Sequence, residues 1–149
     1  MEYIEEFDKL KTKVLKYILF KKRTENEVRQ KFIADEGELL NDVIDELKEL
    51  GYINDERYIE KAVKEYMNLK NLSIKELEYK LISKGIKKSL VDSYIYSNKE
   101  MLLEYEMKSA KNIIIKKINS VDKEDILNYL RKKRYMEDSL RIVIQEIEE

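Results

Sequence analysis

The sequence contains neither cysteine nor histidine. Without cysteine the chain can form no disulfide, thiol nucleophile or thiolate metal site. Without histidine it lacks the commonest general base near neutral pH and the commonest metal ligand. The three glycines lie far apart and none begins a phosphate-binding loop. We therefore expect a protein that is not an enzyme and that binds neither a cofactor nor a metal.

Proline is also absent, and glycine occurs only three times, so few residues can interrupt helices. The 30 basic residues nearly balance the 31 acidic ones, which argues against a generic polycation. The first residues show no basic start followed by an apolar stretch, and no apolar run is long enough to cross a bilayer. We expect no membrane association and, given the lack of cysteine, a cytoplasmic location.

A helix-start pattern recurs along the chain at intervals of 49 residues. Its copies are Thr24-x-x-Glu27, Ser73-x-x-Glu76 and Asp122-x-x-Asp125. Each copy has the form of a capping box, in which an oxygen-bearing side chain and an acid three residues later bind backbone N–H groups at the start of a helix. The third copy is degenerate, with Asp in both places.

The apolar residues around each cap repeat at the same 49-residue interval. Each cap is followed by an apolar pair with i, i+4 spacing, then by a second amphipathic stretch, and is preceded by a longer one. The apolar pairs are Val28 and Phe32, Leu77 and Leu81, and Ile126 and Leu130. The sequence thus predicts an all-α fold of three tandem three-helix repeats, covering residues 1–54, 55–98 and 99–149. Such an array is expected to be elongated and curved.

The segment joining the first two predicted repeats, Leu50-Gly51-Tyr52-Ile53-Asn54-Asp55-Glu56-Arg57-Tyr58, resembles a distinctive motif of the RecX family. Lys22-Arg23-Thr24-Glu25-Asn26-Glu27-Val28 before it is similar to the family's opening motif. Ser73-Ile74-Lys75-Glu76-Leu77 and Lys84-Gly85-Ile86 after it are similar to the family's central repeat. The resemblance covers about Val14 to Ile95, and beyond that it depends on the phase of the repeat.

The resemblance implies a regulatory protein whose partner is the RecA recombinase filament on single-stranded DNA, and we expect the protein to be a monomer. It implies that the protein lies along the filament groove and damps ATP hydrolysis, strand exchange and repressor co-cleavage. The processes concerned would be homologous recombination, DNA repair and the SOS response. Contact with single-stranded DNA would be indirect or weak.

The motif residues that carry the resemblance are Gly51, Tyr52, Asp55, Arg57 and Gly85. Their chemistry indicates structural roles. Both glycines follow a predicted helix end, where a left-handed backbone is favourable. Tyr52 and Ile53 should both be packed. Either Asn54 or Asp55 should cap the next helix, and Arg57 should pair with a nearby acid.

Cations are the candidate partner-binding or DNA-binding residues, since phosphates and acidic surfaces are bound by lysine and arginine. Residues 55–98 carry nine basic and seven acidic side chains, which makes the middle repeat the preferred surface. The candidates there are Lys70, Lys75, Lys80, Lys84, Lys87 and Lys88. Two further runs at predicted helix ends are Lys21, Lys22 and Arg23, and Arg131, Lys132, Lys133 and Arg134.

Two alternatives stay open. Residues 24–53 alone also fit a helix-turn-helix, which would suggest a winged-helix DNA-binding transcriptional regulator. A wing needs a β-hairpin, however, whereas residues 55–69 have helical periodicity, and the recognition helix would be predominantly acidic. An inert helical scaffold would fit if the basic middle surface bound nothing.

Overall fold

The computed structural model describes residues 2–149, which form nine α-helices and one short 3-10 helix without any strand. The elements are α1 (Glu2–Phe20), α2 (Glu25–Lys31), η1 (Ile33–Asp35), α3 (Glu38–Glu49), α4 (Asp55–Leu69), α5 (Ile74–Ser83), α6 (Lys88–Ser97), α7 (Lys99–Lys117), α8 (Lys123–Lys132) and α9 (Glu137–Glu148). The predicted all-α fold is confirmed.

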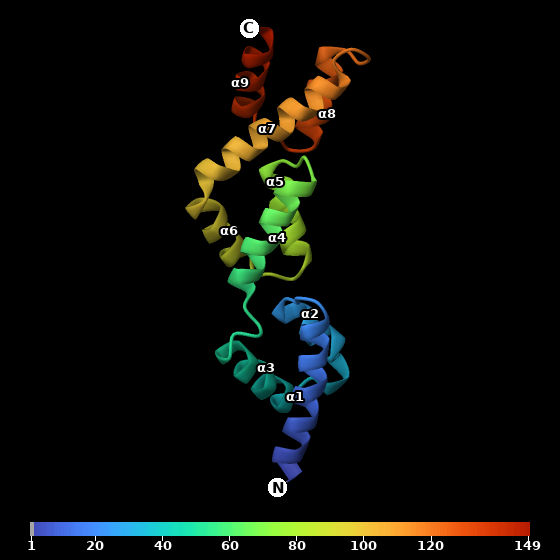
Figure 1. The fold of residues 1–149 in the computed structure, drawn as a ribbon, viewed down its shortest axis with the longest axis vertical. Helices are drawn as coiled ribbons and strands as arrows, with labels where there is room; N and C mark the ends of the chain where they lie inside the picture. The colour runs from blue at the N-terminus through green and yellow to red at the C-terminus, as the bar shows by residue number, and fades with distance from the viewer. Residues whose placement is uncertain (1) are drawn as a thin grey trace.

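The helices gather into three groups along an elongated molecule, with the two termini at opposite ends (Figure 1). The N-terminal group is α1–α3, the middle group α4–α6 and the C-terminal group α7–α9. Each group surrounds a hydrophobic cluster of its own. Val14, Val91 and Val143, one from each cluster, are fully buried. The molecule therefore has three small cores in a row, in agreement with a repeated three-helix unit.

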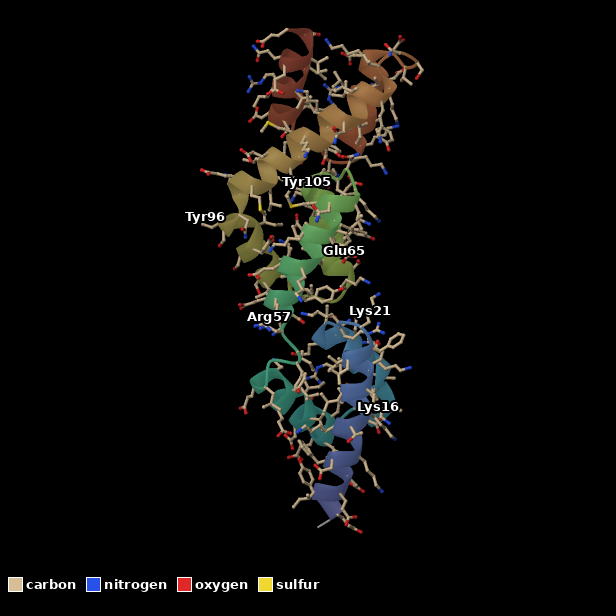
Figure 2. All side chains as sticks on the ribbon, in the orientation of Figure 1. Lys16, Lys21, Arg57, Glu65, Tyr96 and Tyr105 are labelled. Atoms are coloured by element: carbon tan, nitrogen blue, oxygen red, sulfur yellow. The ribbon has the colours of Figure 1, made fainter. Side chains whose placement is uncertain are left out.

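Helix α7 contributes to two of these cores. Leu102 and Tyr105 in its first half pack with the middle group, whereas Ala110 and Ile114 pack with the C-terminal group. The hydroxyl of Tyr105 donates a hydrogen bond to the carbonyl of Lys70 at 2.6 Å. Figure 2 shows Tyr105 where α7 crosses the end of the middle group. One continuous helix thus ties the middle and C-terminal groups together.

Two of the three predicted capping boxes are formed. The backbone N–H of Glu27 donates to Thr24 Oγ1 at 3.1 Å, and the Thr24 N–H donates to Glu27 Oε1 at 3.0 Å. Ser73 and Glu76 make the same pair of bonds at the start of α5. The prediction for the third copy was wrong, because Asp122 makes no side-chain cap. Asp125 is one methylene shorter than glutamate, which shortens its reach back to the backbone.

Both glycines predicted at helix ends have a left-handed backbone, with φ of 83° at Gly51 and 81° at Gly85. A Cβ atom at Gly85 would lie 2.2 Å from the side-chain amide nitrogen of Asn26 in the N-terminal group. Gly85 is thus required both by its conformation and by the close approach of α2. Arg134 has φ of 69°, the same conformation in a residue that carries a side chain.

The winged-helix alternative does not fit this fold. Helix α4 occupies the stretch where the wing would begin, and residues 2–149 contain no β-hairpin. None of the helices in that range combines the length and the hydrophobicity needed to span a bilayer.

Candidate functional site

The junction between the N-terminal and middle groups is held by polar contacts at the start of α2. Thr24 Oγ1 donates to the carbonyl of Lys84 at 2.9 Å. The backbone N–H of Glu25 donates to Asp55 Oδ1 at 3.0 Å, and burial raises the pKa of this carboxyl. Asn54, not Asp55, caps α4 by accepting from the Arg57 N–H at 3.1 Å. The family motif is thus a connection between groups.

The junction between the middle and C-terminal groups repeats this geometry. Ser73 Oγ donates to the carbonyl of Lys133 at 2.6 Å, again across 60 residues. The Ile74 N–H donates to Glu106 Oε1 at 3.0 Å, and Ser139 Oγ donates to Glu106 Oε2 at 2.7 Å. The Glu106 side chain is fully buried, so hydrogen bonds replace its hydration. The start of α5 is thereby fixed against the turn between α8 and α9 (Figure 1).

This junction brings together two basic segments that are far apart in the sequence. A groove of about 600 Å³ lies between α5 and the α8–α9 turn. Its cations are Lys75, Lys80, Lys132, Lys133 and Arg134. We call it the basic groove. Five of the sequence-predicted residues therefore line one concave surface.

Most of the charge in the basic groove is uncompensated. Lys75 pairs with Glu78 at 3.1 Å, and Glu76 is engaged in the cap of α5. Within residues 2–149, Lys80 and the three cations of the α8–α9 turn have no carboxylate within 4 Å. Because unpaired cations attract anions more strongly than paired ones, the groove suits phosphates or carboxylates of a partner.

Aromatic rings accompany these cations. Tyr79 lines the groove and is 75% exposed. The ring of Tyr129 is covered by Lys117 Nζ at 3.8 Å from its centroid and by Lys133 Nζ at 5.7 Å. The groove therefore combines one open aromatic face with several positive charges.

Arg131 lies outside the groove. Its guanidinium pairs with Glu137 at 2.6 Å and with Glu124 at 3.8 Å, and the Glu137 carboxylate raises the pKa of Arg131. The charge of Arg131 is thus balanced within the chain, unlike that of its three neighbours.

The six lysines predicted as one middle surface are divided between places. Lys75 and Lys80 face the basic groove. Lys87 lines a separate hollow of mixed charge beside Gly85 at the first junction. Lys88 pairs with Asp92 at 2.8 Å, which raises the pKa of its ammonium group. Lys84 is part of the first junction through its carbonyl, and Lys70 is exposed after the end of α4.

A second concentration of cations lies beside the first junction. Lys22, Arg23 and Arg57 line a hollow of about 310 Å³, and the Lys61 ammonium beside Lys22 lowers the pKa of Lys22. We call these four residues the cation cluster. Lys21 and Arg57 both lie at this level of the molecule in Figure 2.

In this region the structure differs from two expectations, for Arg57 and Tyr52, and shows one cation that the sequence did not point to, Lys61. Arg57 was expected to pair with an acid, but among residues 2–149 no carboxylate lies within 4 Å of it, and Asp55 at the start of its helix accepts the Glu25 N–H instead. Tyr52 was expected to pack, but it is 47% exposed while Ile53 alone is buried. Lys61 was missed because its place depends on how α4 docks against the end of α1.

Comparison of the sequence with known proteins finds relatives that share one description. No family model matches the sequence. The chain is 30% identical over 151 residues to a regulatory protein RecX of Clostridium acetobutylicum, covering 92% of this chain and 68% of that protein. It is 32% identical over 99 residues to a regulatory protein RecX of Streptococcus agalactiae, covering 62% of this chain. The match spans only 38% of that streptococcal protein, less than two thirds of its length.

The fold has solved counterparts. A crystal structure of RecX from Lactobacillus salivarius superimposes with a TM-score of 0.81 at 22% identity, covering 97% of this chain and 98% of that one. A second crystal structure, of a regulatory protein RecX, gives a TM-score of 0.81 at 17% identity over 97% of this chain and 74% of that one. At these identities the likeness establishes the fold.

Proposed function

Because the chain belongs to the RecX family of regulatory proteins, we propose that it binds the RecA filament on single-stranded DNA and inhibits its ATPase, strand-exchange and co-protease activities. It does so as a binding protein, without catalysing a reaction of its own.

The observation that carries this proposal is the convergence of unpaired cations at the basic groove. The chain as a whole has a formal charge of −1, so attraction to a polyanionic filament must come from local surfaces. The basic groove and the cation cluster lie at successive junctions of an elongated molecule. Two positive regions spaced along one chain suit a partner that presents repeated acidic groups or phosphates.

The polar ties at the junctions support the same function. Each junction joins a cap of one helix group to a carbonyl and an acid of the next. These ties hold the cations of neighbouring groups in a fixed relation, which lowers the entropy lost when an extended partner binds.

The test is the ATPase rate of RecA filaments on single-stranded DNA, measured with increasing amounts of this protein. Wild type should lower the rate, and the double variant Lys132→Glu/Lys133→Glu should need about ten times more protein for the same effect. The matched control is Lys9→Glu/Lys13→Glu, which reverses two exposed lysines on α1 that form no ion pair with any of residues 2–149. A wild-type protein that leaves the rate unchanged, or a control as weak as the groove variant, would contradict the proposal.

A further inference from the structure

We propose that the basic groove holds a single strand of nucleic acid, with one base stacked on the ring of Tyr79 and the neighbouring phosphates on Lys80, Lys132, Lys133 and Arg134. This inference rests on the proposed function, because it names the component of the filament that the groove contacts.

One wall of the groove is a face of α5. Lys75, Tyr79 and Ile82 follow one another at i, i+4 and i+7, which places them on one side of the helix. Tyr79 is 75% exposed and Ile82 is 37% exposed, so neither serves the core of the middle group. A flat ring beside an aliphatic side chain is a suitable platform for a base.

The face of the Tyr79 ring is open. Within residues 2–149 no cation lies over it, whereas Tyr129 nearby is covered by Lys117 and Lys133. The rings of Tyr58, Tyr66 and Tyr94 are packed against the middle core. Among these tyrosines, Tyr79 is thus the one that combines a free ring with a position beside unpaired cations.

The other wall of the groove is the turn after α8. Arg134 in this turn has an unusual backbone conformation. Its backbone has φ of 69°, a conformation that side-chain-bearing residues adopt at a cost. At the equivalent place 49 residues earlier the chain has Gly85, which adopts φ of 81° freely. The second junction thus retains a charged side chain where glycine would relieve the backbone. A role for the guanidinium at the rim of the groove accounts for this difference.

The two acids that line the groove already have partners within the chain. Glu78 pairs with Lys75, and Glu76 accepts a backbone hydrogen bond in the cap of α5. A duplex would leave the ring without a partner, because its bases are stacked on one another and closed to Tyr79. An acidic peptide would use the cations but would leave the ring without a partner.

The first measurement is fluorescence anisotropy of a labelled oligothymidylate with the purified chain at low salt, without recombinase. Tyr79→Ala should weaken binding about tenfold, since stacking of one base is worth about 1.4 kcal/mol or more at such sites. The matched control is Tyr96→Ala, because Tyr96 is 82% exposed on α6, away from the groove (Figure 2). The control should bind as wild type does.

The second measurement uses Arg134→Gly. Glycine removes the charge and also relieves the left-handed backbone, so the melting temperature should stay the same or rise. The slope of log Kd against log salt concentration should fall by about 0.7, the loss of one phosphate contact on a single strand. A variant that loses affinity while keeping or gaining stability cannot be explained by damage to the fold.

The inference is overturned if wild type does not bind the oligonucleotide at low salt, if Tyr79→Ala weakens binding no more than Tyr96→Ala, or if Arg134→Gly leaves the salt slope unchanged. It is also overturned if a duplex binds as tightly as the single strand, or if polyglutamate displaces the oligonucleotide as effectively as an equal concentration of unlabelled strand. If wild type shows the expected dependence on Tyr79 and Arg134 yet leaves filament ATPase unchanged, the inference stands and the proposed function falls.

Discussion

The hydroxyl group of Thr24 caps its own helix and at the same time donates a hydrogen bond to the carbonyl of Lys84, 60 residues further along the chain. Ser73 makes the same two contacts, to the Glu76 N–H and to the Lys133 carbonyl. A hydroxyl can accept and donate together, which a carboxylate cannot. Thr and Ser at these positions therefore start a helix and join it to the following group with one atom.

We expect Ser73→Ala to destabilise the chain by about 1–3 kcal/mol. The variant loses the helix cap and leaves the Lys133 carbonyl without its donor in a place where Ser73 is fully buried. Urea unfolding measures the loss, with Ser89→Ala on the exposed start of α6 as the control. A change for Ser73→Ala no larger than that of the control would show that the junction bond contributes nothing.

The two left-handed glycines should respond differently to alanine. Gly51→Ala adds a Cβ into open space and costs only the backbone conformation, about 1–2 kcal/mol. Gly85→Ala should cost clearly more, because its Cβ would lie 2.2–2.4 Å from three atoms of Asn26. Adding Asn26→Ala to Gly85→Ala should recover part of the difference in urea unfolding. Equal losses for the two single variants would argue against the close approach of α2 to this turn.

Glu106→Gln should destabilise the chain by about 2–4 kcal/mol. The amide replaces one carboxylate oxygen by a donor that would face the Ile74 N–H or the Ser139 hydroxyl. Glu104→Gln is the control, since Glu104 is exposed on the same helix. Thermal melts that show the same midpoint for both variants would contradict a stabilising role for the buried carboxylate.

The pH dependence of stability should include a contribution from Glu25. Burial alone would raise the pKa of Glu25, but Lys48 at 2.9 Å and Arg29 at 3.1 Å outweigh it and lower that pKa. A carboxyl whose pKa is lowered in the folded state stabilises the fold above its unfolded pKa, and this stability is lost as the pH falls through the lowered folded value.

Glu25→Gln should therefore melt below wild type at pH 7, and the two proteins should converge as the pH falls below the unfolded pKa of a glutamate and through the folded one. Glu49→Gln, an exposed acid at the end of α3, should show no such trend. A gap between wild type and Glu25→Gln that stays constant with pH would exclude this ion-pair contribution.

The helices could be predicted because their signals are local. Capping boxes at Thr24 and Ser73, glycine at positions 51 and 85, and apolar residues with helical spacing all concern neighbouring residues. The third box failed because the pattern was extended to Asp122, whose side chain matches the residue type but makes no cap.

The arrangement of the cations could not be predicted in the same way. Lys80 meets Lys133 and Arg134 only because Ser73 docks against the α8–α9 turn, which is a contact between groups. The division of the middle lysines between two junctions has the same origin. That these cations contact a partner stays a prediction.

Glu106 could have been found from the sequence. It lies among Leu103, Met107 and Ala110 on an apolar face of α7, and a charged residue on such a face must be paired or hydrogen-bonded. Its partners, Ile74 and Ser139, come from other groups and could not have been named.

The sharing of α7 between two cores has a mechanical consequence. Bending between the middle and C-terminal groups would have to break a continuous helix that carries Leu102 in one core and Ile114 in the other. The N-terminal and middle groups share no helix and are joined by the short stretch between α3 and α4 and by the hydrogen bonds of Thr24 to Lys84 and of Glu25 to Asp55. The second junction is therefore held by a continuous helix as well as by hydrogen bonds, whereas the first depends on its hydrogen bonds and the connecting stretch. Local unfolding should separate α1–α3 from the rest of the chain more readily than it separates α4–α6 from α7–α9, so amides in α1–α3 should exchange with deuterium as a separate unit.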